Sequence, residues 1–490
     1  MLKKVGVIGS GFSGLAAAAC LAKAGFEVTV LEKNNELGGR ARKFETQGFT
    51  FDMGPSWYWM PEVFEQFFNL FDKKSSDFYE LVRLDPSYEV LFGKDDKVAL
   101  PADFESLKNV FESIETGSSV KLEEFLADAE YKYKVGMSEF VWKPGHSIME
   151  FADIRVVMSL FRLQMLSSIS SQIDRLFKSE KIRNILKFPV LFLGATPENT
   201  PALYSLMNYA DLKLGTWYPL GGMFKVIDAF VEISENQGVK FIRNAEVKSI
   251  SVKDNLAHIV NTENNSYTFD YVVASADYHH VEQKLLPEAY RNYSESYWQK
   301  RTMAPSSLLF YLGLDIKLEN VKHHNLFFDR DFAQHAHEIY TEPSWPSEPL
   351  FYMCVPSVTD ASLAPEGNEN VFILMPLAPG IEDNDILREQ YFDIICKRLE
   401  DVTGINIKPN IIYKKSYCVN DFVSDYNAFR GNAYGLANTL KQTAFLKPKL
   451  RNKFLSNLYY TGQLTSPGPG VPPSIISGQV VASEIIKTNK

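Results

Sequence analysis

The first thirty residues change from one apolar pattern to another in a way that predicts strand, turn, helix and strand. Val5–Ile8 is a short apolar run, typical of a buried strand. A glycine-rich turn and an alanine-rich helical segment follow it. The sequence EVTVLE, which begins at Glu27, then has the pattern of a second strand. This order predicts a βαβ unit with parallel strands.

Similar patterns predict further elements downstream. Phe224–Asn236 has the apolar spacing of an amphipathic helix, and VKFIR after it is predicted to be a third parallel strand. From Ala245 to Ser275 the residues alternate like a small β-meander, with turns at KDN and ENN, and end in the strand DYVVAS. NLYYTG, near the C-terminus, is predicted to be the last strand.

A second set of strands and a helical stretch complete the pattern. YEVLFGKDDKVALP, from Tyr88, predicts a hairpin, and SSLLFYLGL, PLFYMCVP and NVFILMPLAP predict strands of an antiparallel sheet. Ala102–Lys213 contains few helix breakers and has apolar residues three or four positions apart. That region is therefore predicted to be helical.

Composition and charge narrow the class of protein. A chain of 490 residues is expected to form two or three domains, and 45% hydrophobic with 23% charged residues is typical of soluble globular proteins. The net charge of -9 argues against a nucleic-acid partner. Four scattered cysteines without a CxxC pair indicate no disulfide framework and favour a reducing, cytosolic setting.

The longest uncharged run, Phe454–Ser483, is long enough to cross a bilayer but contains SPGPGVPP at its centre. Proline and glycine at that density cannot continue a helix. Any membrane attachment is therefore expected to be peripheral.

The glycine-rich turn of the βαβ unit has the spacing of a nucleotide-binding loop. Gly9, Gly11 and Gly14 have G-x-G-x-x-G spacing, which permits a tight turn, close approach of a pyrophosphate and close helix–strand packing. The helix N-terminus offers free N–H groups to the anion. Glu32 ends the second strand, where a carboxylate accepts hydrogen bonds from a ribose. We therefore predict a dinucleotide site without a 2′-phosphate.

The next segment favours FAD over NAD. KNNELGGRARKFETQGFTFDMGPS contains Gly39, Arg40 and Arg42 and then a strand that reaches Gly54. Paired glycines allow close backbone approach, and the arginines supply cations beside a phosphate or a flavin edge. No second nucleotide-binding fingerprint is found, so no nicotinamide site is expected.

These motifs together resemble the FAD amine-oxidase superfamily, and within it the bacterial-type phytoene desaturases of carotenoid synthesis. The similar segments are FDMGPSWYWMP, YPLGGMFKVIDAF, HHNLFF, APEGNENVF and YYTGQLTSPGPGVPPSIISGQVVASEII. The resemblance covers nearly the whole chain and is weakest in the middle. It implies an α/β fold with a discontinuous Rossmann-like FAD-binding domain, an antiparallel-sheet substrate domain and a helical lid or membrane-facing region.

The expected boundaries follow from those segments. The FAD-binding domain comprises residues 1–75, 218–285 and 455–490, the substrate domain comprises 76–101 and 286–454, and the helical region is 102–217.

The resemblance also implies roles for single residues. It places the backbone of Val247 near the adenine and Gly462, Gly470 and Val471 near the flavin. It puts an acidic residue at Asp360, our first candidate for a proton acceptor whose pKa is raised by an apolar tunnel, with Asp153 second. The alternative for each is a solvated or capping aspartate. Gln463 stands where relatives often have an acidic residue, so a weaker contact to the ribityl chain is expected.

Trp57, Trp59 and Met60 follow the arginine element directly and should project where the two domains meet. Such large side chains either form ordinary core or line a tunnel for a long apolar polyene, and we favour the tunnel. No metal site is predicted: His323 and His324 are adjacent, so in a strand their rings would face opposite sides.

An apolar substrate would come from a bilayer, so peripheral attachment to the cytoplasmic membrane is expected. Val157, Leu160, Phe161, Met165 and Leu166 have helical spacing and lie among basic residues, as in an interfacial helix. The alternative is a lid helix packed on the substrate domain. The basic residues in question are Arg155, Arg162, Arg175, Lys178, Lys181 and Arg183.

The resemblance implies an FAD-dependent desaturase that most simply converts phytoene towards lycopene by hydride transfer and proton loss. Alternatives within the family are a hydroxycarotenoid 3,4-desaturase, a carotene isomerase and a retinol saturase. A prenyl-lipid binder of the GDP-dissociation-inhibitor type has a similar fold, but the intact glycine loop, Glu32 and GGRAR argue against it. The sequence carries no signal for an oligomeric state.

Overall fold

The computed structural model describes residues 2–145, 167–191, 194–439, 441–443 and 446–489. One of its two large sheets is five-stranded and entirely parallel, in the order β19-β13-β1-β2-β9. Its strands are β1 (Lys4–Ile8), β2 (Glu27–Leu31), β9 (Lys240–Ile242), β13 (Tyr271–Ala274) and β19 (Leu458–Tyr460). Every strand that the sequence pattern predicted for this sheet is present, although the strands come from three distant parts of the chain.

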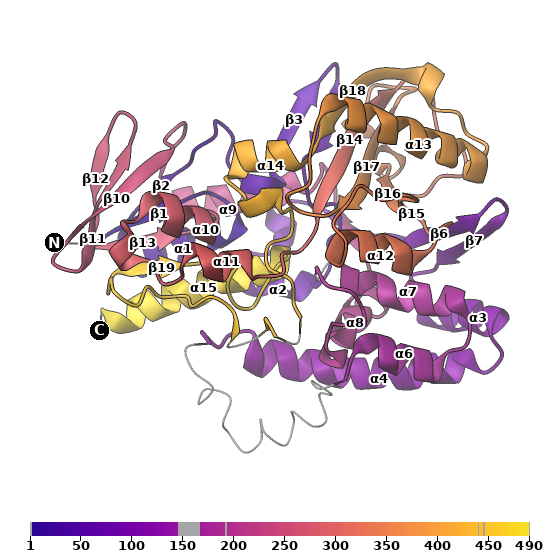
Figure 1. Cartoon of the computed structure of the whole chain (residues 1–490), viewed down its shortest axis with the longest axis horizontal. Helices are drawn as coiled ribbons and strands as arrows, with labels where there is room; N and C mark the ends of the chain where they lie inside the picture. Colours follow the sequence, from indigo (N-terminus) through magenta and orange to yellow (C-terminus); the bar gives the residue numbers. More distant parts are fainter. Residues whose placement is uncertain (1, 146–166, 192–193, 440, 444–445, 490) are drawn as a thin grey trace.

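Three long helices pack around this sheet, as Figure 1 shows on its left side. They are α1 (Phe12–Lys23), α9 (Phe224–Asn236) and α15 (Val471–Thr488). Helices α1 and α15 approach each other so closely that a Cβ added to Gly478 would lie 2.3 Å from the carbonyl oxygen of Ser13. Helix α2 (Pro61–Asn69) joins the same core, where the ring of Phe67 stacks on Phe230 at 4.0 Å.

The predicted meander is also present. Strands β10 (Val247–Lys253), β11 (Leu256–Thr262) and β12 (Ser266–Thr268) form a three-stranded antiparallel sheet directly before β13. Two short antiparallel pairs lie elsewhere, β3 (Lys43–Thr46) with β4 (Phe49–Asp52), and β5 (Leu81–Arg83) with β8 (Trp217–Pro219).

The second large sheet has seven strands in the order β18-β14-β17-β16-β15-β6-β7. Its strands are β6 (Tyr88–Gly93), β7 (Asp96–Leu100), β14 (Ser306–Leu314), β15 (His324–Phe327), β16 (Phe351–Cys354), β17 (Glu369–Leu377) and β18 (Ile411–Tyr417). The sheet differs from the prediction in one pair, because β15 runs parallel to β6. Strands β6 and β7 therefore share a sheet with strands that follow residue 286.

Helices of the second half lie beside both large sheets. Helix α13 (Asp385–Thr403) packs on the seven-stranded sheet, where the ring centroids of its Phe392 and of Phe310 in β14 are 4.9 Å apart. Tyr278 of α10 (Tyr278–His280) and Trp298 of α11 (Glu295–Gln299) are instead buried in a core cluster with Val272 of the parallel sheet. Helices α12 (Phe332–Tyr340) and α14 (Val419–Tyr426) also belong to this part of the chain.

A layer of helices lies below the seven-stranded sheet in Figure 1. It consists of α3 (Phe104–Ile114), α4 (Ser118–Val135), α6 (Ile169–Leu176), α7 (Glu180–Leu191) and α8 (Leu206–Leu212). Several apolar residues of α6 and α7 are buried in the core, including Ile173 and Ile185. These side chains pack inside the protein, and the lid and membrane-facing roles of the region stay predictions.

The apolar residues proposed to contact a membrane, from Val157 to Leu166, lie outside the described residues. Two of the basic residues nearby have acidic partners, since Lys181 pairs with Asp96 at 2.5 Å and Arg183 with Asp174 at 3.8 Å. Within the described part of the chain, no helix combines the length and apolar character that a membrane crossing requires.

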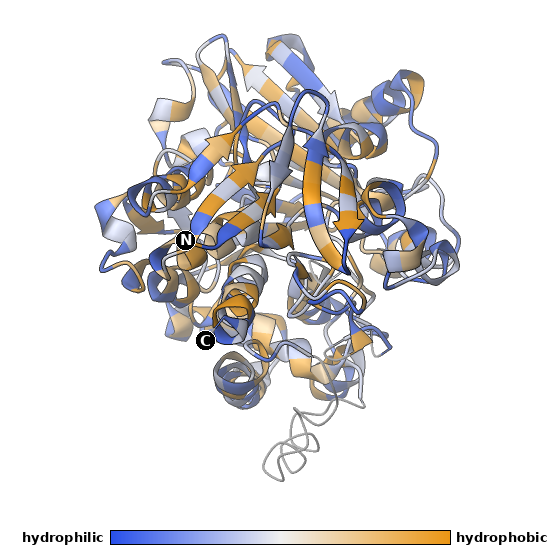
Figure 2. Cartoon of the chain, turned by 90° about the vertical axis from the view of Figure 1, so that its left-hand side faces the viewer, coloured by the Kyte–Doolittle hydropathy of each residue, from blue (hydrophilic) through white to orange (hydrophobic). Residues whose placement is uncertain are grey.

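Buried hydrophobic residues surround both large sheets, and one cluster extends from Val28 of the parallel sheet to Leu309 of the seven-stranded sheet. Figure 2 shows hydrophobic residues along the strands and a mixture of hydrophobic and hydrophilic residues along the surrounding helices. All nine residues of β14 are buried, as expected for a strand covered on both faces.

Candidate functional site

A cavity of about 380 Å³ begins at the carboxyl ends of β1 and β2 and extends to the seven-stranded sheet. The order of the parallel sheet reverses next to β1, which is the place where open α/β sheets bind their ligands. Ten of the predicted cofactor residues line this cavity. They are Gly9, Gly11, Glu32, Gly39, Arg40, Gly54, Val247, Gly462, Gly470 and Val471.

The glycines of the loop have two different roles. One leaves room for a ligand, and another allows close packing of the backbone. Gly9 has a φ of +97°, a conformation that favours glycine. A Cβ added to Gly11 would meet nothing within 4 Å, so the space above it is open to a pyrophosphate. Gly14 does not line the cavity: its Cβ would lie 2.2 Å from the carbonyl oxygen of Gly9. Its role is the close helix–strand contact.

Glu32 is buried and held in place. One carboxylate oxygen accepts hydrogen bonds from the amide and hydroxyl of Ser10 at 2.9 and 2.6 Å, and the other accepts one from the amide of Asn34 at 2.9 Å. A carboxylate has about four acceptor sites, two on each oxygen, so the oxygen bonded to Asn34 retains one of them. The predicted contact to a ribose is therefore chemically possible at this position.

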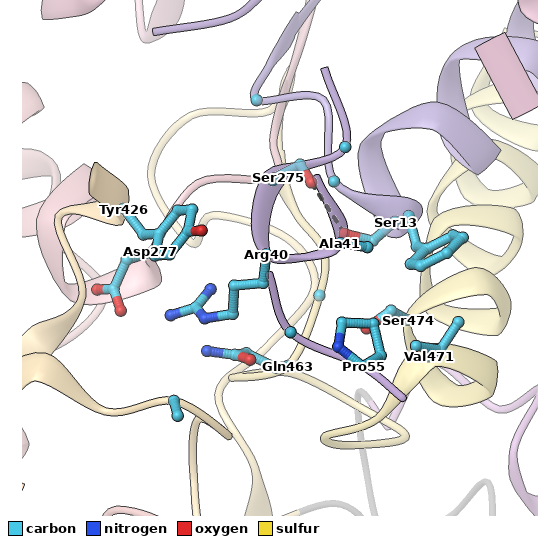
Figure 3. Close-up of a pocket in the computed structure, with 18 of the residues that line it drawn as sticks. Ser13, Arg40, Ala41, Pro55, Ser275, Asp277, Tyr426, Gln463, Val471 and Ser474 are labelled. Atoms are coloured by element: carbon cyan, nitrogen blue, oxygen red, sulfur yellow. Dashed lines mark hydrogen bonds between the residues drawn. The ribbon is translucent and has the colours of Figure 1, made fainter. Parts of the chain in front are cut away.

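The two arginines of the GGRAR element differ. Arg40 extends into the cavity beside Gln463, as Figure 3 shows, and its Nε has no partner among the described residues. Burial lowers the pKa of Arg40, which Tyr426 and Asp277 oppose. A buried, incompletely bonded guanidinium fits an anionic cofactor.

Arg42 does not line the cavity, which contradicts its predicted contact with the cofactor. Its guanidinium forms an ion pair with Asp425 and lies 5.3 Å from the ring centroid of Tyr426. The reason is local geometry: Arg40 lies within the short 3₁₀ turn Gly39–Ala41, whereas Arg42 follows it in an extended conformation. Arg42 therefore contacts two residues that line the cavity, Asp425 and Tyr426, but does not line it itself.

The C-terminal segment closes the cavity on the opposite side. Helix α15 begins at Val471, directly after Gly470, so the positive end of its dipole adjoins the cavity, although Pro472 and Pro473 in its first turn carry no N–H. In Figure 3, Val471, Ser474 and Pro55 lie across the cavity from Tyr426 and Asp277. Gln463 donates a hydrogen bond to Oδ1 of Asn432 at 3.2 Å.

The tryptophan segment divides between cavity and core. Trp57, Trp59 and Met60 line the cavity, as predicted, and the two indole rings are 5.2 Å apart. Tyr58 points away and stacks on Phe64 at 4.2 Å. Trp59 Nε1 donates to Thr216 Oγ1 at 2.9 Å, so the ring has a fixed orientation. Substrate binding by these residues stays a prediction.

Asp360 does not have the environment that was predicted for it. It is absent from the cavity lining, and its carboxylate accepts hydrogen bonds from Gly221 N at 2.6 Å and from the amide and hydroxyl of Ser362. Burial alone would raise its pKa, but the bonds from Ser362 and Gly221 bring the pKa below its usual value. The capping alternative is confirmed. Asp153 lies outside the described residues.

The histidine pair also differs from the prediction. The rings of His323 and His324 are 4.4 Å apart, because β15 begins at His324 and His323 is not subject to strand alternation. Both are buried. Burial lowers the pKa of His323 to about 3 and holds the pKa of His324 well below its usual value, so both imidazoles are neutral.

Sequence reasoning missed two features, a buried carboxyl outside the lining of the cavity and a second cavity. Asp211 is a buried carboxyl that accepts hydrogen bonds from Tyr88 at 2.7 Å and Thr216 at 3.3 Å, and burial raises its pKa to about 7. The second feature is a smaller apolar cavity of about 70 Å³, which shares Tyr352 and Tyr434 with the first. No motif marks either one, because each is assembled from separate elements.

Residues 12–486 match the model of the flavin-containing amine oxidoreductase family. Solved structures with this fold include an oxidoreductase from Methanosarcina mazei, with a TM-score of 0.65 and 17% identity over 98% of this chain and all of that one. Cyclohexylamine oxidase from Brevibacterium oxydans has a TM-score of 0.59 and 14% identity over the full length of both chains. FAD is accordingly the cofactor, and the glycine loop, Arg40 and the start of α15 are the parts of the cavity lining that would hold it.

Two curated relatives are more similar in sequence. The carotenoid 3,4-desaturase of Haloarcula japonica is 41% identical over 485 residues, covering 99% of this chain and 98% of the relative. The 4,4′-diapophytoene desaturase of Staphylococcus aureus is 33% identical over 496 residues, covering 99% of both. The chain therefore belongs to the flavin-containing amine oxidoreductase family, and within it to the carotenoid desaturases.

Proposed function

We propose that this FAD-dependent enzyme desaturates the 3,4 bond near the end of an acyclic carotenoid. Identity to the carotenoid 3,4-desaturase is 41%, against 33% to the diapophytoene desaturase, over nearly the same span of the chain. The sequence-based prediction of phytoene as the substrate becomes the second candidate. It is favoured by the diapophytoene desaturases among the relatives.

The small second cavity is the observation that carries the choice of bond. It lies beyond Tyr352 and Leu374, which line both cavities, and its volume is only about 70 Å³. A bond near the end of the chain needs room for only the few carbon atoms that lie beyond it. A bond near the centre of a long polyene would require space for half of the molecule.

The lining of the second cavity suits such an end group. It consists almost entirely of apolar side chains, among them Phe188, Phe328 and Ile339. Burial of the substrate's apolar carbon atoms in this cavity contributes about 25 cal/mol of binding free energy per Å². This burial requires no hydrogen bond to the substrate. The protein therefore selects its substrate by length and shape.

Desaturation removes two hydrogens from neighbouring carbons, and FAD is the two-electron acceptor when it is bound. The chain contributes orientation and a dry environment. Trp57 and Trp59 both line the cavity, and π-electrons of such rings stabilise positive charge that develops on a nearby polyene. The apolar lining keeps water away from that charge.

A substrate panel tests the proposal. The purified protein with added FAD is given either phytoene or a fully conjugated acyclic carotenoid in lipid vesicles, and products are separated and identified by absorption and mass. We expect the conjugated substrate to lose two or four hydrogens, with absorption at longer wavelength, and phytoene to be unchanged. Conversion of phytoene alone would assign the second candidate.

We also infer that the protein works at the cytoplasmic surface of the membrane. A carotenoid is dissolved in the bilayer, and a peripheral enzyme must take it up from there. The segment from Arg155 to Leu166 combines basic and apolar residues at helical spacing, which supports an interfacial contact.

A further inference from the structure

The wall between the two cavities carries a hydroxyl group in an otherwise apolar setting. Tyr352 lines both cavities and is only 6% exposed. Its hydroxyl oxygen lies 2.6 Å from Nδ1 of His324 and 3.0 Å from Oγ of Ser56, which also lines the larger cavity. Both distances are those of good hydrogen bonds.

His324 is held for this contact. It is fully buried, and the indole of Trp57 stacks on its ring with a centroid distance of 4.0 Å and an angle of 10°. Its Nε2 has no hydrogen-bond partner among the described residues. The imidazole is neutral, because burial and the neighbouring His323 lower its pKa. It can therefore accept a proton at Nδ1 when the tautomer carries hydrogen on Nε2.

The carboxylates of the described cavity lining already have partners. Glu32 accepts from Ser10, Asp425 pairs with Arg42, Asp277 accepts from the amides of His280 and Phe429, and Glu246 pairs with Lys33 and Lys248. All four come from the segments that surround the nucleotide half of the cavity. Asp360, the predicted acceptor, does not line it.

We propose that Tyr352 and His324 accept the proton that desaturation releases. One substrate C–H bond breaks with its electron pair, and that hydride goes to FAD as the oxidant. The neighbouring C–H bond loses its hydrogen as a proton to the Tyr352 oxygen, while the Tyr352 proton moves to Nδ1 of His324. The electron pair left on carbon forms the double bond. This proposal rests on the proposed function.

A neutral imidazole is a sufficient base for this step. Loss of hydride leaves a carbocation delocalised over the polyene, and such a cation is a far stronger acid than an imidazolium. A low imidazolium pKa then favours onward transfer of the proton. The ring of His323 lies 4.4 Å from that of His324, and Nδ1 of His323 lies 2.8 Å from Oγ1 of Thr359, which is half-buried.

Tyr352 is the catalytic residue in this scheme, and His324 acts through it. Tyr352→Phe keeps the ring but removes the hydroxyl, and His324→Asn is a second variant in case the first does not fold. With the carotenoid that the wild type converts, we expect Tyr352→Phe to lower kcat about 100-fold or more, with KM and the spectral shift on carotenoid binding unchanged. Tyr391→Phe is the matched control, since its hydroxyl donates to the carbonyl of Pro346 away from both cavities.

An isotope effect separates chemistry from structural damage. With deuterium on the carbon that loses the proton, Tyr352→Phe should show a larger isotope effect on kcat than the wild type, because proton loss has become slower. A kcat within threefold of the wild type, or an unchanged isotope effect, would overturn the proposal. Inactivity of the wild type towards every carotenoid would instead count against the proposed function.

Metal content gives a further check. The ligand atoms of His323, His324 and Cys354 all lie within 4.8 Å of one another. Stoichiometric zinc or copper in the purified holoenzyme would overturn the proposal, because an ion on these residues would occupy the imidazole that must receive the proton. We expect less than a tenth of an equivalent of either metal.

Discussion

At the scale of single residues, the contrast between Arg40 and Arg42 predicts different effects of the same substitution. Arg40→Ala removes a guanidinium that reaches the cofactor cavity with an unpartnered Nε. A charged hydrogen bond contributes about 1.5–3 kcal/mol, so FAD affinity should fall about 10- to 100-fold. Arg42→Ala should change FAD affinity much less, because its partner is Asp425. Titration of both apoproteins with FAD, followed by flavin fluorescence, measures the difference; equal losses would contradict this assignment.

Asp211 predicts a pH dependence of stability. Its pKa is about 7 in the folded protein against 3.8 in the unfolded chain. The folded state therefore binds the proton more tightly, and the stability that the neutral form contributes is lost as the pH rises from about 4 to 7. The difference corresponds to at most about 4 kcal/mol.

Asp211→Asn cannot titrate and still accepts a hydrogen bond from Tyr88. The free energy of unfolding of the variant should consequently fall less steeply over this range than that of the wild type. Asp52 and Glu282, whose pKa values burial also raises, are present in both proteins and cancel in the comparison. Denaturant titrations at pH 5, 6 and 7 test this, and parallel curves would show that Asp211 is not the cause.

At the scale of elements, helix α1 separates two functions of the glycine loop. A Cβ on Gly14 would press on the carbonyl of Gly9 and on the Ser275 hydroxyl, 2.9 Å away, so Gly14→Ala should destabilise the apoprotein by about 1–3 kcal/mol. A Cβ on Gly11 meets nothing within 4 Å, and its φ of -68° suits alanine. Gly11→Ala should melt like the wild type without FAD yet bind FAD weakly. Thermal melts of both apoproteins and FAD titrations distinguish these outcomes; a destabilised Gly11→Ala would refute the separation.

Helix α12 offers a matched pair of substitutions for the second cavity. Ala336 lines that cavity, whereas Ala333 is exposed on the same helix. Ala336→Leu adds apolar volume where the substrate end is proposed to lie, and should raise KM or abolish conversion. Ala333→Leu should have neither effect. Measuring kcat/KM for both variants tests whether the second cavity holds the end of the substrate. Equal activity of the two variants would mean that it does not.

At the scale of the whole molecule, the helices and strands were easier to predict from the sequence than the contacts between them. Periodicity indicated all five parallel strands, and G-x-G-x-x-G identified the cofactor loop, because both signals are local. The parallel pairing of β15 with β6, the position of Asp360 and the pairing of Tyr352 with His324 depend on contacts between distant segments. Tyr352 lies 28 positions from its partner, and no short motif records such a contact.

The remaining question at this scale is how an apolar substrate reaches a cavity inside a protein of net charge -9. Anionic lipid would repel the molecule as a whole, so attachment must depend on a local patch of basic and apolar residues. The segment from Arg155 to Leu166 is such a patch in sequence. Phe161→Glu should therefore reduce binding to anionic vesicles about tenfold or more, and high salt should weaken binding of the wild type.

A control for this prediction comes from helix α6, which is already packed on the core. Arg175 lies on that helix, so Arg175→Gln should leave vesicle binding nearly unchanged. Flotation of the three proteins with vesicles, with FAD bound throughout, measures the effect directly. If Phe161→Glu floats as well as the wild type, the membrane contact lies elsewhere, and the substrate must enter by another face. If only Phe161→Glu is lost from the vesicles, the segment from Arg155 to Leu166 delivers the carotenoid, and loss of turnover on vesicles but not in detergent should accompany it.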